Sequence, residues 1–579
     1  MRYRLAGGSQ ITQRRADAMT SFRHDRRVES EPARGAGRPR SLVDRLRVSP
    51  FALYLCLTLI AVGSAVGDPD VVVAQPSHRV YEMPKLAPSE VYGDLRHLQP
   101  VGVPQRPYFV PRRLTPPPTS KSAPPAVAPE DVTSAPPPRA PMPSPNQNFP
   151  GLSSADNCGG VPCGAGWPPD ANGDVGPNHY VQAVNDAYAI YSKTGALLAS
   201  FTENQLWSGA GTTPCNGNSF GNPVVLYDQL ADRWILTHIA FATNGGELVS
   251  PFYQCIAASK TGDPVSGGWW LYALRMDPGG APFPPVGTLN DYPRFGIWPD
   301  CLYMAANGFQ FPGGNFIGTS FASFSRADLY SGAPLTWGLG FINDATGPFT
   351  MIPSNLLGRS GESLPPPGTP NYFVSESLSS FAFEVRKFTA GPNCGGGGTL
   401  SGPTNVSQTS YTVPDDLIVP QPGTSVMLDS VPDRLMQKVQ YRRIGSAESL
   451  WVVHTVQTSA TSTVRPQWAQ LDVTGAVIGT SPVQQQIYAP DATLHRWVGS
   501  LAVDKQGNMA LGYSTSNGNA PNFPSIAYAG RLASDSPNSL PQSEIQVVAG
   551  AGSQTNTSRW GDYSAMSIDP TDDCTFWYT

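Results

Sequence analysis

One local pattern recurs along most of the chain: a short apolar strand, a turn centred on Asp, and a second apolar strand. The clearest instance is residues 223–276, where PVVLYD, RWILTHIAF, FYQCIAASK and WWLYALRM follow one another. Each run is rich in β-branched or aromatic residues and is bounded by turn formers, which predicts four strands in series. Seven openings of this kind occur, at residues 170–185, 223–238, 292–307, 351–377, 426–443, 497–514 and 560–579.

The spacing of these openings predicts the architecture. Consecutive openings lie roughly 50 to 75 residues apart, which is room for four strands each. This period favours an all-β fold, a seven-bladed β-propeller over residues 157–579 with insertions in its loops. A β-sandwich is the alternative, but it needs no seven similar openings. Because residues 560–579 supply only two strands, we expect the last blade to be incomplete and the chain to be truncated at its carboxyl end.

Composition agrees with a turn-rich β protein and excludes one class of partner. The 579 residues include 60 Pro and 58 Gly, which argues against long helices. The net charge is −5, from 38 basic and 43 acidic side chains. A nucleic-acid binder needs an excess of basic side chains to neutralise phosphates, so we expect no nucleic-acid partner.

The amino-terminal part reads as a targeting segment followed by a linker. Residues 1–50 form a basic region that contains twelve Arg and no Lys, and residues 51–74 contain the apolar run FALYLCLTLIAVGSAVG. This order predicts a signal peptide, cleaved before Asp68 or Gln75, or an uncleaved membrane anchor. Either places the rest of the chain in the extracellular space or on the cell surface, with membrane contact only through that anchor.

Residues 75–156 are predicted to be a disordered, Pro-rich linker. Seventeen of the 51 residues from 100 to 150 are Pro, interleaved with Ser, Ala and Thr. Proline at this density favours an extended spacer and prevents a packed core. A strand within residues 101–110 is disfavoured, because Pro104 and Pro107 lack the backbone donors that a strand needs.

The cysteines fit an oxidising compartment. Apart from Cys56 in the apolar run, the chain has seven, and none forms a zinc-type CxxC motif. We expect disulfides that join Cys158 to Cys163 and Cys215 to Cys255. The odd count leaves one thiol over, and a partner for Cys574 beyond Thr579 would explain it.

Five stretches carry a resemblance to a known family: PPDANGDVGPNHYVQAVNDAYAIYSKTGALL, VVLYDQLADRWILTHIAF, YAPDATLHRWVGSLAVDKQGNMALGYS, SIAYAGRLASD and RWGDYSAMSIDPTDDCTFWYT. Over residues 157–579 the chain resembles large secreted bacterial proteins with a propeller-like repeat domain and no established activity. The resemblance implies an extracellular propeller and supplies no catalytic residues. Many relatives have Asp where this chain has Asn222, so a role for that carboxylate does not transfer.

Three arginines occupy matching places in their repeats and are candidate ligand-binding residues. Arg294, Arg496 and Arg559 lie just before or within predicted first strands, which line the channel of a propeller. Arginines grouped at one mouth can hold a carboxylate bidentately; structural salt bridges between blades are the alternative. The accompanying candidates are Asp291, Asp562, Trp497 and Trp560.

A second candidate site is the loop DANGDVG. Asp170, Asn172 and Asp174 alternate as oxygen ligands do in calcium loops, although position twelve is Val181 where an EF-hand needs Glu. The loop is therefore either a Ca²⁺ site completed by other blades or a turn rich in Asp and Asn. No other cofactor is expected.

These features predict a ligand-binding protein ahead of an enzyme. The chain contains neither HExxH nor GxSxG. We expect a secreted or surface-tethered, non-catalytic monomer whose partner is an extracellular carbohydrate or protein. The alternative is a glycoside hydrolase or lyase that acts on an anionic glycan at the channel mouth.

Overall fold

The four strands predicted in residues 223–276 are present. They are β13 (Val224–Asp228), β14 (Arg233–Asn244), β15 (Glu247–Ser259) and β16 (Trp269–Arg275), each antiparallel to the one before it. The structure is a computed structural model that describes residues 2–6, 77–101, 114–117, 119, 121, 140–153, 155–163, 168–211, 214–359 and 364–579. The signal or anchor segment predicted at 51–74 lies outside these residues. Within them, no helix has the length and apolar character needed to cross a membrane.

The same meander recurs in the other sheets. One sheet contains β9 (Asn172–Val175), β10 (His179–Val184), β11 (Ala187–Ser192) and β12 (Leu197–Thr202), and another β17 (Thr288–Ile297), β18 (Cys301–Gln310), β19 (Asn315–Ser325) and β20 (Trp337–Ile342). The next two meanders are β21 (Phe349–Leu356), β22 (Asn371–Glu376), β23 (Ala382–Thr389) and β24 (Thr399–Leu400), then β28 (Val439–Ile444), β29 (Ala447–Val456), β30 (Arg465–Asp472) and β31 (Pro482–Ile487). They are followed by β32 (His495–Val503), β33 (Met509–Ser516), β34 (Ser525–Arg531) and β35 (Gln542–Val548), and finally by β36 (Met566–Ile568) and β37 (Thr575–Tyr578).

Short elements connect or extend these sheets. The α-helices are α1 (Glu203–Ser208) and α2 (Arg326–Ser331), and the 3₁₀ turns are η1 (Leu95–His97), η2 (Pro392–Cys394) and η3 (Thr474–Ala476). The remaining short strands are β7 (Asn157–Cys158), β8 (Val161–Pro162), β25 (Thr404–Ser407), β26 (Leu417–Val419) and β27 (Leu428–Asp429).

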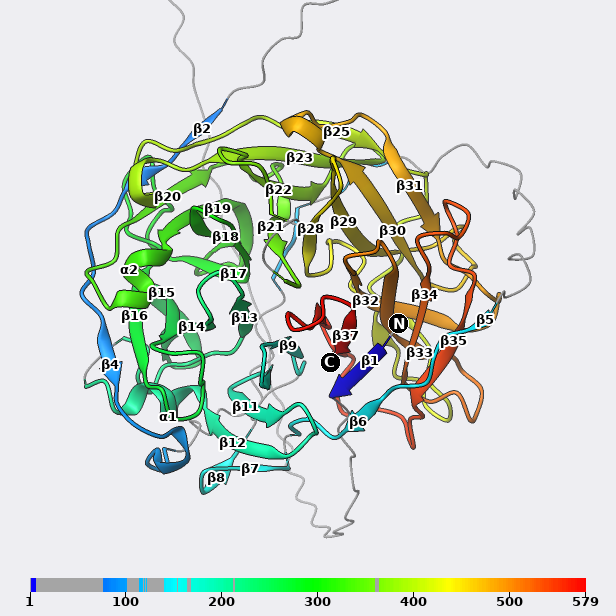
Figure 1. Ribbon diagram of the computed structural model, residues 1–579, viewed down its shortest axis with the longest axis horizontal. Helices are drawn as coiled ribbons and strands as arrows, with labels where there is room; N and C mark the ends of the chain where they lie inside the picture. The colour runs from blue at the N-terminus through cyan, green and yellow to red at the C-terminus, as the bar shows by residue number, and fades with distance from the viewer. Residues whose placement is uncertain are drawn as a thin grey trace, which may run out of the picture. The chain divides into compact units, whose positions relative to one another are not determined.

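The sheets are arranged around a common centre as the blades of a propeller (Figure 1). The first strands meet there in the order β9, β13, β17, β21, β28, β32 and β36, and β36 in turn contacts β9. Strands β21 and β28 pair directly in parallel, so two meanders share one continuous sheet. The predicted all-β class and propeller arrangement are confirmed.

Neighbouring first strands approach closely at the centre. A Cβ added at Gly296 of β17 would lie 2.3 Å from the carbonyl oxygen of Ser354 in β21, a separation at which one of the two strands must shift. Glycine at this position therefore allows the two backbones to touch. The main hydrophobic clusters lie further out, on the faces of the sheets, and are rich in aromatic residues such as Trp298, Tyr303 and Phe388.

The amino-terminal segment adds outer strands to several sheets. Strands β2 (His78–Arg79), β3 (Tyr81–Glu82), β4 (Ser89–Val91) and β5 (Ala140–Pro141) pair with β24, β20, β16 and β35. The prediction of a disordered linker over 75–156 is therefore wrong for residues 77–101 and 140–153. Proline density did not prevent pairing, because each contact is a strand of two or three residues on one sheet edge.

The last sheet is not left with a bare edge. Strand β1 (Arg2–Ala6) pairs in parallel with β37, and β6 (Gln147–Phe149) pairs in parallel with β1. In the full chain the last blade is therefore not incomplete. Its missing strands come from distant parts of the chain, which a search for a local meander does not detect. Cleavage of the predicted signal before Asp68 or Gln75 would remove β1, and an anchor at 51–74 would place β1 across the membrane from β37, so in either case the edge of β37 would be free, as predicted.

Disulfides join Cys158 to Cys163 and Cys215 to Cys255, as predicted, and a third joins Cys301 to Cys394. The third links the start of β18 to η2, across 93 residues of sequence. Cys574 is a free thiol.

We predict that Leu95→Ala destabilises the protein. Leu95 belongs to the amino-terminal segment, is 2% exposed, and packs in the hydrophobic cluster that contains Trp207 and Trp269. Truncating a buried Leu leaves a cavity and costs about 2–4 kcal/mol, measurable by denaturant unfolding. Tyr92→Ala in the same segment is the control, because Tyr92 is 76% exposed. If Leu95→Ala is as stable as the wild type, the amino-terminal segment does not pack against the hydrophobic core in solution.

Candidate functional site

The strands that meet at the centre begin with an unusual backbone conformation. Left-handed φ angles occur at non-glycine residues within the first strand of successive sheets or up to eight residues before it: Asp170 (50°), Asn222 (54°), Tyr292 (53°), Thr350 (50°), Val431 (49°), Val498 (52°) and Asp562 (65°). In β17, β21 and β32 the residue lies inside an irregularity of the strand register. Bulges and strained residues of this kind re-aim side chains and gather at functional sites.

A group of acidic and arginine side chains lies at these strand starts, and we call it the mouth cluster. It comprises Asp170, Asp291, Tyr292, Arg294, Asp429, Asp433, Arg434, Arg559, Asp562 and Tyr563. The charges of Asp170, Asp291, Arg294, Asp429, Arg434, Arg559 and Asp562 act on one another's pKa values, so these groups lie within electrostatic range. The structure thus brings together four predicted residues, Arg294, Arg559, Asp291 and Asp562.

Arg559 and Asp562 form the most exposed ion pair of the cluster. Nε of Arg559 donates to Oδ1 of Asp562 at 3.2 Å, and Nη2 pairs with Oδ2. The same Nε lies 4.0 Å from Oδ2 of Asp429. The Arg559 side chain is 39% exposed, so this pair is open to a ligand from solvent.

Arg434 is the mouth arginine that the sequence analysis did not single out. It donates from Nε to Asp433 Oδ1 at 2.6 Å and from Nη2 to Oδ2 at 2.9 Å. Its guanidinium carbon lies 4.8 Å from the ring centre of Tyr292 and 5.5 Å from that of Phe349. The available signal was its place in the fifth repeat opening, residues 426–443.

Burial raises the pKa values of several carboxyl groups of the mouth cluster. Burial and the charge of Asp562 raise the pKa of Asp170 well above its ordinary value. Burial also raises the pKa of Asp291, whose Oδ1 accepts from Asn222 at 3.2 Å. The pKa of Asp429 rises to about 6, again chiefly through burial. The cluster therefore mixes ion pairs with carboxyl groups that can donate a hydrogen bond.

Arg496 and Trp497 do not join the mouth cluster. Nε of Arg496 donates to Glu544 at 2.7 Å and Nη2 to Asp491 at 2.5 Å, so this arginine is an internal salt-bridge residue of the β32–β35 sheet. Trp497 is fully buried in the core of that sheet. Trp560 is half-buried next to it, and its Nε1 donates to Ser514 Oγ at 3.0 Å.

The side-chain oxygens of the calcium-like loop bind protein groups. Asp170 Oδ2 accepts from the hydroxyl of Tyr563 at 3.0 Å, and Asn172 Oδ1 accepts from the Val225 amide at 2.9 Å. Asp174 Oδ2 accepts from the Tyr227 amide at 3.1 Å and also contacts a lysine. Calcium binding at this loop stays a prediction.

That lysine, Lys438, occupies the centre below the mouth. Its Nζ lies 3.1 Å from Asp174 Oδ2 and donates to Ser567 Oγ at 3.0 Å, and its side chain is 3% exposed. It thus connects the segment before β28 with β9 and β36.

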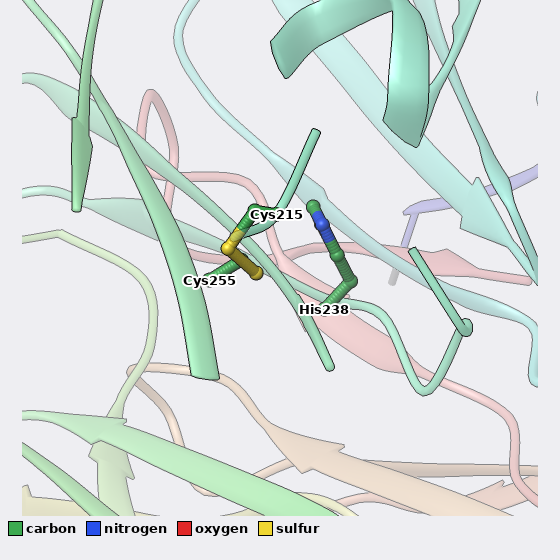
Figure 2. A group of neighbouring side chains, drawn as sticks. All are labelled: Cys215, His238 and Cys255. Atoms are coloured by element: carbon green, nitrogen blue, oxygen red, sulfur yellow. A yellow bond between two sulfur atoms is a disulfide. The ribbon is translucent and has the colours of Figure 1, made fainter. Parts of the chain in front are cut away.

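A different group, Cys215, His238 and Cys255, has its ligand atoms within 4.8 Å of one another (Figure 2). The two cysteines are joined as a disulfide, so neither offers the thiolate that a metal needs. Burial lowers the pKa of His238 to about 3, and the ring packs edge-on against Trp207. We interpret this group as part of the core.

The chain was compared with known proteins. No family model matches the sequence, and no curated protein matches it. Similar solved structures include a thermostable family-43 glycoside hydrolase, with 13% identity, coverage of 56% of this chain and 96% of that chain, and a TM-score of 0.25. An exo-β-1,3-galactanase from Phanerochaete chrysosporium has 10% identity, covers 66% of this chain and 90% of its own, and has a TM-score of 0.27. An endo-arabinanase from Bacillus licheniformis has 10% identity, covers 54% of this chain and 94% of its own, and has a TM-score of 0.24. Likeness this distant carries no argument about activity.

We predict that Asp429→Asn gains stability relative to the wild type as the pH rises. An acid whose pKa rises on folding, here from 3.8 to about 6, stabilises the folded state fully below its unfolded pKa. That contribution is lost as the pH rises through 6 and amounts to at most about 3 kcal/mol. Asparagine does not titrate, so urea unfolding at pH 4, 5, 6 and 7 should show the gain. A difference that is constant with pH would contradict the shift.

Proposed function

We propose that this protein is a seven-bladed propeller that acts outside the cell and binds a carbohydrate at its mouth cluster. The observation that carries the binding site is the convergence of arginines and aspartates from different sheets at one partly exposed place.

Two observations support seven blades. The contacts between first strands run from β9 through β13, β17, β21, β28 and β32 to β36 and back to β9. A left-handed non-glycine residue lies within the first strand of each of these sheets, or up to eight residues before it, from Asp170 to Asp562. A backbone feature that recurs with each sheet is expected of a repeat architecture.

Carbohydrate is the ligand class that best fits the chemistry of the mouth. Sugar hydroxyls both donate and accept hydrogen bonds, and the mouth offers both partners side by side. The ion pairs Arg559–Asp562 and Arg434–Asp433 supply charged donors and acceptors. The pKa of Asp170, raised well above its ordinary value, adds a carboxyl group that can donate when protonated.

An extracellular location is supported by the cysteines and by the sequence. Three disulfides among the described residues are typical of proteins that fold in an oxidising compartment. The basic and apolar residues 1–67 have the order of a secretion signal or anchor. The resemblance to secreted bacterial propeller proteins points the same way.

We predict that Arg559→Ala weakens glycan binding about tenfold or more. Its guanidinium is the most exposed charged donor of the cluster, and a hydrogen bond to a charged group contributes about 1.5–3 kcal/mol. A glycan array first identifies a ligand, and calorimetry then compares the proteins. Arg443→Ala is the matched control, because Arg443 lies near the other end of the first strand β28. Equal affinities for the wild type and Arg559→Ala would remove the mouth as the binding site.

A glycoside hydrolase is the second candidate, and one observation favours it. Asp429, with a pKa of about 6, has the proton affinity of a general acid near neutral pH. It lies beside Arg559 and within electrostatic range of Asp562, which supplies a second carboxyl group. Glycoside hydrolysis requires a pair of carboxyl groups, one as the acid and one as the base or nucleophile.

Mass spectrometry of glycan ligands incubated with the protein separates the two candidates. An enzyme should release products with saturable kinetics, and Asp429→Asn should lower the rate at least a hundredfold while binding persists. If no bound glycan yields products, the hydrolase candidate is excluded and only the binding function is kept.

A further inference from the structure

Arg294 differs from the other arginines of the mouth cluster, because no carboxylate pairs with it among the residues that the structure describes. Its side chain is 1% exposed. Its Nη1 donates to the carbonyl of Pro293 at 3.0 Å, whereas Nε and Nη2 have no hydrogen-bond acceptor. By contrast, the buried Arg442 and Arg496 each form an ion pair with a carboxylate.

Two aromatic rings lie against the Arg294 guanidinium. Its central carbon lies 3.5 Å from the ring centre of Tyr292 and 4.0 Å from that of Tyr563. The ring planes are nearly perpendicular to each other, at 85°. Because the two rings are perpendicular, only one of them can stack on the guanidinium plane, and both attract the cation. The Nε and Nη2 edge is therefore held in place, and neither nitrogen has an oxygen or nitrogen acceptor within hydrogen-bond distance.

That edge is the one that matches a carboxylate. Nε–H and one Nη2–H of a guanidinium point in the same direction and bind the two oxygens of a carboxylate side-on. A buried charge without a counter-ion destabilises the folded protein, and an incoming anion would remove that penalty. Affinity for an anion is therefore built into this position.

A buried acid within electrostatic range of Arg294 reinforces the same preference. Asp170 is buried, its Oδ2 accepts from the Tyr563 hydroxyl, and its Oδ1 has no partner among the described residues. Because its pKa is raised well above the ordinary value, the protonated form can donate to an oxyanion. No ion pair joins Asp170 to Arg294 among the described residues, and the charge of Arg294 acts on the pKa of Asp170 only as a lowering contribution.

We propose that Arg294 binds a carboxylate of the ligand through Nε and Nη2, so that the ligand is an acidic carbohydrate such as a uronic-acid polymer. This inference rests on the proposed carbohydrate binding at the mouth. Arg559, Asp429 and Asp562 contact the hydroxyl groups, and Arg294 selects the acidic sugar.

The test uses two pairs of probes and two arginine variants of the full chain. The melting temperature in sodium acetate, compared with that in sodium chloride, tests whether Arg294 binds a carboxylate on its own. Calorimetry with oligogalacturonides and with their carboxyl-reduced counterparts tests whether the protein prefers an acidic sugar. Arg294→Lys keeps the positive charge but lacks the two parallel N–H donors of the guanidinium. Arg496→Lys makes the same change in an arginine that already forms an ion pair with Glu544.

We expect acetate to raise the melting temperature of the wild type and of Arg496→Lys, and not that of Arg294→Lys. We also expect the wild type to bind the oligogalacturonide at least tenfold more tightly than the reduced form, and Arg294→Lys to lose this preference. If Arg294→Lys does not fold, the ratio of wild-type affinities for the oligogalacturonide and its reduced form still tests whether the ligand is an acidic sugar.

The outcomes separate this inference from the proposed function. Equal binding of the acidic and reduced sugars would overturn the role of Arg294 and keep carbohydrate binding. An acetate effect that depends on Arg294, without binding of either sugar or of any glycan on the array, would support the anion site and overturn carbohydrate binding. Absence of both effects would overturn both.

Discussion

Hydrogen bonds between neighbouring first strands hold the centre of this protein together. Side-chain amides bond the backbone of the adjacent strand: Asn172 accepts from Val225, Asn355 from Ile297, and Gln440 from Val503, at 2.6–2.9 Å. Lys438 adds a buried ion pair to Asp174 across the centre. Because buried polar groups must be paired, these bonds fix the position of each first strand relative to the next. The side chains at the strand starts are positioned as a result.

The mouth cluster combines two electrostatic situations. Arg434 and Arg559 face carboxylates and are partly exposed, so a ligand can exchange hydrogen bonds with them at little cost. Arg294, Asp170 and Asp291 lie deeper, where burial raises the pKa of both acids and leaves the guanidinium without a counter-ion. The depth of each group, more than its identity, decides whether it is paired, protonated or free to bind.

The amino-terminal segment stabilises the sheets from outside. A free sheet edge invites association with other chains, and short strands from this segment cover the edges of β16, β20, β24 and β35. Further along, Lys121 reaches the buried Glu376 at 2.7 Å, and Tyr411 donates to the same carboxylate. The segment is therefore part of the folded unit at each of these places.

The sequence by itself determined the strand meanders, because apolar runs and turn residues are local signals, as residues 223–276 demonstrate. It also predicted two disulfides and four residues of the mouth, since Arg294, Asp291, Arg559 and Asp562 lie within or just before recurring strand starts. Only the tertiary structure decided that Arg496 pairs with Glu544 and that Arg434 belongs to the mouth, because side-chain partners depend on packing between sheets. The pairing of β37 with β1, and of the predicted linker with sheet edges, joins residues far apart in the chain. A reading of local pattern contains no information about such contacts, because edge pairing uses backbone groups that every residue except proline possesses in full.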